Sequence, residues 1–172
     1  IRSSAWGSII FSILVIFLYI LVRFKKWQFS LGAVVAVFHD VLIVLAIFSI
    51  FYGIMPFSLE IDQAFIAAIL TIIGYSLNDT VVVFDRVREY MEMHKKREIE
   101  MVMNNALNST LSRTINTSMT TFFVLFVIFL FGGEVIRGFM FALMIGVIVG
   151  TYSSLFVASP IMLDTLKRKE KE

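Results

Sequence analysis

Five apolar stretches, each long enough to cross a lipid bilayer, decide what this chain can fold into. They cover residues 5–22, 31–53, 62–84, 110–131 and 135–161. About 20 helical residues span the hydrocarbon core, which is ~30 Å thick. Apolar residues make up 59% of the 172 residues and the mean hydropathy is +0.89, more than a soluble domain of this size can bury. The sequence predicts an all-α membrane protein, one domain over residues 1–172 with a bundle of five transmembrane helices.

The charged residues collect between these stretches. Three blocks, at residues 23–26, 85–100 and 164–172, contain 12 of the 15 lysines and arginines, whereas Arg2 and Arg137 belong to the opposite side. By the positive-inside rule the three blocks are cytoplasmic, with the amino terminus outside and the carboxyl terminus inside. Basic residues placed in this way orient a membrane protein in lipid, so we expect no nucleic-acid partner.

Residues 86–104 carry dense mixed charge at helical spacing, for example Glu92 with Lys96. This pattern predicts a cytoplasmic amphipathic helix that connects the third and fourth spans.

One absence limits the chemistry that we expect. The chain has no cysteine, which excludes disulfides and thiolate sites, and we expect no metal site or cofactor.

The first apolar stretch leads into further spans without a small-residue cleavage site, so we do not interpret it as a signal peptide. Because the chain begins at Ile1 rather than at a methionine, we expect it to be part of a longer protein.

Three ionisable residues interrupt the apolar stretches: Asp40, Asp79 and Arg113. Each costs at least ~2.5 to 3.5 kcal/mol at mid-membrane unless it is paired or hydrated. Asp79 follows Asp62 by 17 residues and Arg113 precedes Gly132 by 19, which is about 26 and 28 Å along straight helices. Asp79 and Arg113 should therefore lie at similar depth on consecutive antiparallel helices, where we predict an ion pair.

Polar and small residues follow one face of each of these two helices. On the fourth span the face consists of Thr110, Arg113, Thr114, Thr117, Ser118 and Thr121. On the third span it consists of Ala64, Ala67, Ala68, Thr71, Gly74, Tyr75, Asn78 and Asp79. A polar face in a membrane must look toward protein or water, so we expect both faces to point inward, with Thr114, Thr117 and Ser118 holding proton-carrying waters. The alternative is that the hydroxyls only bond their own backbone at position i−4 and the charges only fix helix register.

Asp40 has two interpretations, an inward-facing packing group or a member of a proton relay. His39 precedes it, and a role for this histidine in the relay is the less favoured interpretation. A third class, an intramembrane aspartyl protease using Asp40 and Asp79, is disfavoured. These aspartates follow histidine and asparagine, unlike the Tyr-Asp and Gly-x-Gly-Asp motifs of such proteases, and Arg113 would keep one of them ionised. We expect no enzymatic activity.

Four ordered motifs resemble the SecF family of the bacterial SecDF protein-export machinery, within the RND superfamily. They are Phe38-His-Asp40, residues 74–89 from GYSLNDTVVVF to DRVRE, residues 111–118 with the sequence LSRTINTS, and residues 146–154 with the sequence GVIVGTYSS. The resemblance covers nearly the whole chain. It implies an RND-type half that contains the last five of six membrane helices, without the first helix and the periplasmic domain that follows it.

The resemblance also implies a function. SecF proteins act with SecD, separate or fused upstream, in the bacterial inner membrane, with the amino terminus of this segment periplasmic and the carboxyl terminus cytoplasmic. The pair uses inward proton flow to help draw exported polypeptide from the SecYEG channel. The proton-path groups of the family match Asp79 and Arg113, to which we add Asn78, Thr114, Thr117 and Asp40. A change in the separation of Asp79 and Arg113 would change the protonation of Asp79 and so link motion to the proton. The alternative is a structural or assembly subunit without an ion path.

Overall fold

The computed structural model describes residues 2–170 and is built from helices, with no strand among these residues. The elements are α1 (Arg2–Phe24), α2 (Trp27–Phe51), α3 (Gln63–Met93), α4 (Ile99–Phe131), α5 (Glu134–Ser153), the π-helical segment η1 (Ser154–Ala158) and α6 (Ser159–Glu170). Four stretches are long and apolar enough to cross a membrane: Trp27–Phe51, Gln63–Met93, Ile99–Phe131 and Glu134–Arg168. With α1 as a fifth helix, the predicted all-α membrane bundle is confirmed.

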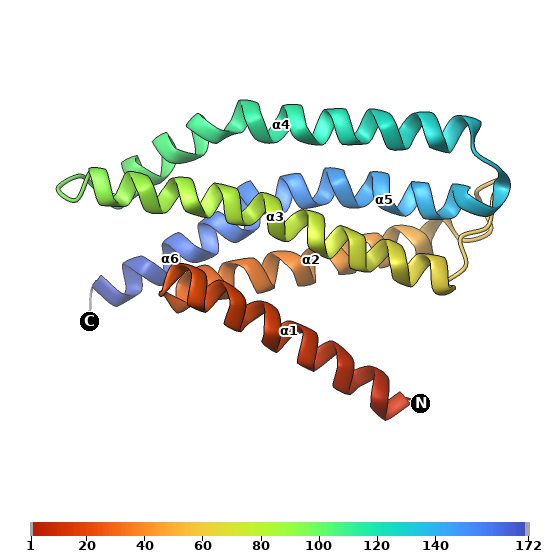
Figure 1. The fold of residues 1–172 in the computed structure, drawn as a ribbon, viewed down its shortest axis with the longest axis horizontal. Coiled ribbons are helices and arrows are strands. Elements are labelled where there is room, and N and C mark those ends of the chain that lie inside the picture. The colour runs from red at the N-terminus through yellow and green to blue at the C-terminus, as the bar shows by residue number, and fades with distance from the viewer. Residues whose placement is uncertain (1, 171–172) are drawn as a thin grey trace.

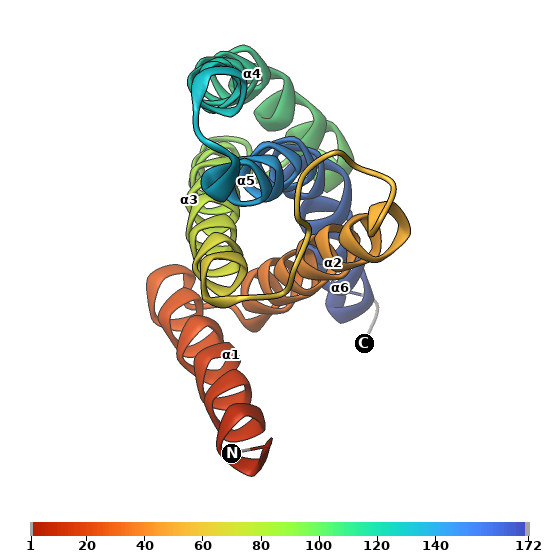
Figure 2. The same ribbon diagram turned by 90° about the vertical axis from the view of Figure 1, so that its right-hand side faces the viewer.

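The helices α2, α3 and α5 form the centre of the bundle (Figure 1). Helix α4 packs on α3 and α5, whereas α1 contacts mainly α2 and leans away from the rest, as the view along the bundle shows (Figure 2). The α1–α2 turn, the α3–α4 turn and the end of α6 lie together at one end of the bundle (Figure 1). Lys167 of α6 forms an ion pair with Glu100 of α4 at this end. The three basic blocks therefore share one end, as their charge predicts.

The predicted connecting helix over residues 86–104 is not a separate element. Helix α3 continues through its charged residues to Met93, the chain turns over residues 94–98, and α4 begins at Ile99. With 31 and 33 residues, α3 and α4 are about 46 and 50 Å long, which exceeds the ~30 Å hydrocarbon core, so their ends extend into the aqueous phase. Lys96 lies beyond the end of α3 and does not pair with Glu92 among the described residues.

A proline explains why the last span, predicted over residues 135–161, contains a π-helical segment between two α-helices. Pro160 has no N–H, so the carbonyl of Phe156 has no partner at i+4, and the proline ring would clash with that carbonyl. The helix widens to a π-helix just before this point, and the hydroxyl of Ser159 donates to the Ser154 carbonyl at 2.8 Å. Such π segments are frequent at functional sites.

Gly32 allows α2 to pack against this widened segment. A Cβ atom at position 32 would lie 2.6 Å from the backbone oxygen of Ala158. We expect Gly32→Ala to destabilise the folded protein by roughly 1 to 3 kcal/mol, because the backbone has to move apart. Thermal unfolding in detergent measures this effect. Gly74→Ala is the matched control, since a Cβ there meets nothing within 4 Å; equal melting temperatures for the two variants would contradict the close packing at Gly32.

Two apolar clusters fill the interior, one toward each end of the bundle. The cluster at the charged end includes Phe24, Phe29 and Phe84, and the cluster at the other end includes Phe48 and Phe65. Between them lies a set of buried polar side chains that we call the polar layer: Asp40, Ser76, Asp79, Ser153 and Ser154. The polar layer is the candidate site.

Candidate functional site

Each side chain of the polar layer comes from one of the central elements. Asp40 lies on α2, Ser76 and Asp79 lie one turn apart on α3, and Ser153 and Ser154 lie where α5 passes into η1. The two carboxyl groups are 1% and 8% exposed. A carboxyl group is expensive to bury, so hydrogen-bond donors have to surround it.

Asp40 is the most enclosed ionisable group of the layer. Its Oδ2 atom accepts hydrogen bonds from the Ser76 hydroxyl at 2.5 Å and from the Ser153 hydroxyl at 2.8 Å. Its Oδ1 atom lies 3.1 Å from Nδ1 of His39. This carboxyl group therefore joins α2, α3 and α5 through hydroxyl groups, with a half-exposed histidine beside it.

A glycine brings these helices close enough for the hydroxyls to reach. A Cβ atom at Gly150 of α5 would lie 3.1 Å from Cβ of Ser76 on α3. Sequence reasoning did not identify Ser76, Ser153 or Ser154 as site residues. The signal was present, because Ser76 precedes Asp79 by one helical turn and the two other serines extend the small-residue spacing of Gly146 and Gly150.

Asp79 occupies the second buried position. Its Oδ2 atom accepts a hydrogen bond from the Ser154 hydroxyl at 3.0 Å. Thr114 of α4 lies beside the same carboxyl group. The Thr114 hydroxyl is fully buried, yet its geometry gives it no hydrogen bond to any described residue. Asp79 and Thr114 thus bring together α3, α4 and η1, with unused hydrogen-bonding capacity at Thr114.

The predicted ion pair between Asp79 and Arg113 is not formed. Arg113 makes no ion pair within 4.0 Å with a carboxylate of the described residues, and its side chain is exposed. Asp79 and Arg113 do lie at similar heights along α3 and α4, as predicted, since Thr114, the residue after Arg113, lies beside Asp79. Successive residues are about 100° apart around a helix, so Thr114 faces Asp79 and Arg113 points to one side.

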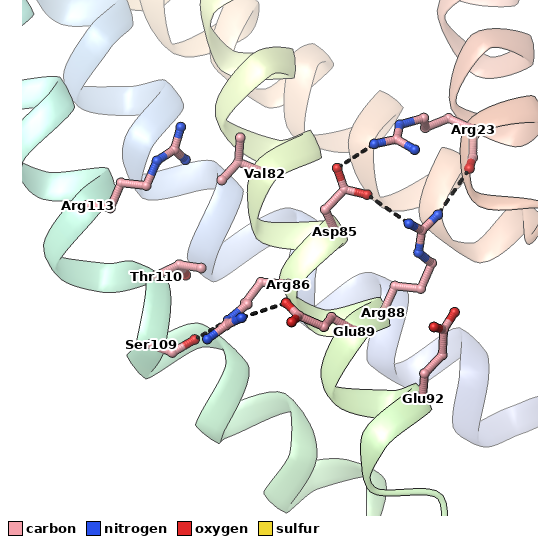
Figure 3. A pocket seen from close by; sticks show the side chains of 10 residues that line it. All are labelled: Arg23, Val82, Asp85, Arg86, Arg88, Glu89, Glu92, Ser109, Thr110 and Arg113. Atoms are coloured by element: carbon pink, nitrogen blue, oxygen red, sulfur yellow. Dashed lines mark hydrogen bonds and ion pairs between the residues drawn. The ribbon is translucent and has the colours of Figure 1, made fainter.

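Arg113 instead lines a charged pocket at the basic end of the bundle (Figure 3), with a cavity volume of about 580 Å³. The lining residues are Arg23, Val82, Asp85, Arg86, Arg88, Glu89, Glu92, Ser109, Thr110 and Arg113. Asp85 pairs with Arg23 at 2.8 Å and with Arg88 at 3.5 Å. Within residues 2–170, no group of three histidine or carboxylate side chains comes together as a metal site. The pocket leaves the Arg113 side chain open to water, whereas the buried Asp79 is not among the residues that line it.

Three further hydroxyls of the predicted polar face of α4 bond in two different ways. Thr117 and Thr121 donate to the carbonyls four residues earlier, at 2.9 Å each, so for these two the local-bonding alternative is correct. Ser118 instead reaches across helices, since its hydroxyl lies 2.5 Å from that of Thr151 on α5 and accepts from the Tyr75 hydroxyl of α3 at 3.2 Å. Only part of the predicted polar face of α4 points inward.

The predicted inner face of α3 is largely exposed. Of its eight members only Ala68 and Asp79 are buried, and Asn78 is exposed. Bulky side chains such as Ile72 fill the interior instead, because Gly146 of α5 leaves room for them; a Cβ atom at Gly146 would lie 2.2 Å from Ile72. The exposed positions are Ala64, Ala67, Thr71, Gly74 and Asn78.

The chain is similar to known membrane proteins over nearly its whole length. A family model described as protein export membrane protein SecD/SecF, C-terminal, matches residues 1–168. Protein translocase subunit SecF of Rhodothermus marinus is 61% identical over 168 residues, which cover 98% of this chain and 54% of that protein. Protein translocase subunit SecF of Petrotoga mobilis is 46% identical over 171 residues, which cover 99% of this chain and 54% of that protein.

The fold is likewise similar to a solved structure. The crystal structure of SecDF in a super-membrane-facing form superimposes with a TM-score of 0.84 and 37% sequence identity, over 99% of this chain and 22% of that chain. The present chain therefore spans about half the length of the curated relatives it matches, and a smaller share of the SecDF chain.

Proposed function

This chain belongs to the SecD/SecF carboxyl-terminal family of protein export membrane proteins, and we propose that it serves export as a SecF-type subunit driven by proton movement across the membrane. The observation that carries the proposal is the polar layer. Two carboxyl groups, Asp40 and Asp79, are buried at mid-bundle among hydroxyls, without an ion pair to lysine or arginine among the described residues. Small residues would hold the helices together at a lower free-energy cost than buried carboxyl groups. Two buried carboxyl groups in a membrane therefore support a proton path.

In this proposal Asp79 takes up and releases the transported proton. Thr114 lies on one side of Asp79 with an unused hydroxyl, and Ser154 donates on the other. Water in the charged pocket connects this point with the cytoplasm, and Arg113 lines the pocket one residue away from Thr114. Ser153, which precedes Ser154 in the chain, donates to Asp40, and this makes Asp40 the second carboxyl group of the relay. Protons then pass between the two ends of the polar layer.

A partner has to complete the path. Three polar residues are exposed on this chain, Asn78 of α3 and Arg113 and Thr117 of α4. Polar groups at membrane depth require cover by protein or water. We propose that a SecD-type chain, separate or fused upstream, covers this face and that the assembly acts beside a SecYEG-type channel on exported polypeptide. The solved SecDF structure supports this partner.

Proton movement supplies enough free energy for such a role. One proton moving inward releases ~2.3 kcal/mol per 100 mV of membrane potential. This amount shifts an equilibrium between two conformations more than tenfold. We place the basic end of the bundle in the cytoplasm of the bacterial inner membrane, because 12 of the lysines and arginines belong there by the positive-inside rule.

Proton flux into liposomes tests the proposal directly. We expect the complete SecD-containing complex to carry protons down an imposed gradient well above protein-free liposomes. We expect the SecF-type protein without its partner to stay near background, because its polar face on α3 and α4 is then uncovered. A complex that assembles and shows only background flux would reject the proton-driven function and favour the alternative, a structural or assembly subunit.

A further inference from the structure

A second pocket at the basic end of the bundle differs in charge from the first. It lies between the α1–α2 turn and the end of α3 and has a cavity volume of about 440 Å³. Its lining includes one carboxylate and five cations: Glu92, Arg23, Lys25, Lys26, Arg88 and Lys95. We propose that this basic pocket binds the phosphate head group of an acidic phospholipid. Basic pockets between membrane helices on the cytoplasmic side are suited to such head groups.

The lysines of the basic pocket carry charge that the chain does not neutralise. Arg23 and Arg88 both pair with Asp85. Lys25, Lys26 and Lys95 are exposed, and none forms an ion pair or a side-chain hydrogen bond with another described residue. Three cations that converge on one cavity repel each other, and a bound phosphate relieves that repulsion. The charge therefore selects an anion.

The floor of the basic pocket is apolar, which favours a lipid over a soluble anion. Phe24 and Phe29 line it, both buried, with their rings stacked 5.0 Å apart. Trp27, between them in the sequence, is 46% exposed. Tryptophan is enriched where membrane meets water, so the cavity lies at head-group depth. Lysines above such a floor extend their charged ends toward phosphate while their stems cover apolar surface.

The backbone at the rim supports the same assignment. Lys25 has φ of 57°, a left-handed conformation that glycine adopts without strain and a lysine rarely adopts. A cation is thus present where the turn itself favours glycine. Lys26 immediately precedes α2, and its side chain makes no capping hydrogen bond to the helix, which leaves its ammonium group available to a phosphate.

Binding by the complete protein in neutral detergent micelles tests the proposal. The ligands are phosphatidylglycerol, phosphatidylcholine and inorganic phosphate, each titrated separately and counted by native mass spectrometry. We expect phosphatidylglycerol to bind at least tenfold more tightly than phosphatidylcholine. Replacing Lys25, Lys26 and Lys95 together by glutamine should abolish this preference, because each basic residue near an acidic lipid strengthens the attraction roughly fivefold. Replacing all three by arginine should restore it.

The matched control removes the same charge from the same end of the bundle. Lys96→Gln, Arg97→Gln and Arg168→Gln together change exposed residues that do not line the basic pocket, and they should leave the preference intact. If the control lost the lipid preference as fully as the pocket variant does, the lipid would be attracted diffusely to the basic end and not bound in the pocket. If inorganic phosphate bound as tightly as phosphatidylglycerol, the ligand of the pocket would be a soluble anion and not a lipid. Equal binding of the two lipids would overturn the proposal altogether.

Discussion

Replacing Asp79 by asparagine should reduce proton flux through the complete complex to the level of protein-free liposomes. The amide keeps the size of the carboxyl group and still accepts the hydrogen bond from Ser154, but it cannot take up a proton. We therefore expect the complex to assemble normally, with the free energy of unfolding changed by less than about 1 kcal/mol. Flux is measured with a pH-sensitive dye inside liposomes, and assembly by co-purification of the partner.

The control is Asp62→Asn, which makes the same chemical change outside the polar layer. Asp62 caps the start of α3 by accepting from the backbone N–H of Phe65 at 2.8 Å, and asparagine is an equally good cap. This variant should keep full flux. Arg113→Leu should reduce flux as Asp79→Asn does, because the charge of Arg113 in the charged pocket then no longer influences the protonation of Asp79. Normal flux in both Asp79→Asn and Arg113→Leu would mean that the two charges are architectural.

The sequence predicted the membrane class, the helical bundle and the common end of the basic blocks because these follow from composition along the chain. Hydropathy does not report where a helix ends once it has left the membrane. For this reason the sequence did not predict that helix α3 continues to Met93, beyond the point after Phe84 where the chain becomes charged. The π-helical segment had a signal, since Pro160 lies within the last apolar stretch. The prediction of a span over residues 135–161 did not use this signal, although Glu134–Arg168 is indeed one apolar stretch long enough to cross a membrane.

The rotation of each helix was the part that spacing alone did not determine. Both faces of α3 contain small residues, and the inward one is selected by the fit of Ile72 against Gly146. The pairing of each carboxyl group with its serines depends on that rotation. The sequence identified Asp40 and Asp79 as unusual because an ionisable residue in an apolar stretch is costly wherever it points. Their hydrogen-bond partners required the packed structure.

Replacing Asp40 by alanine should strongly destabilise the folded bundle. It leaves the hydroxyls of Ser76 and Ser153 without their shared acceptor in a buried position, and we expect a loss of about 2 to 4 kcal/mol of stability. Asp40→Asn retains an acceptor oxygen and should unfold near the temperature of the parent. Thermal unfolding of the complete protein in detergent separates these two variants, and equal melting temperatures for both would contradict the role of the shared acceptor.

Proton flux then decides which interpretation of Asp40 is correct. As a second relay group, Asp40 should be needed in its titratable form, so Asp40→Asn should reduce flux at least tenfold in a stable complex. Ser76→Ala is the control, because it removes a hydrogen bond worth about 1 kcal/mol while Ser153 still donates to the carboxyl group. That variant should retain most of the flux. Full flux in Asp40→Asn, with flux lost in Asp79→Asn, would assign the proton to Asp79 alone and leave Asp40 as the acceptor that fixes how α2, α3 and α5 cross.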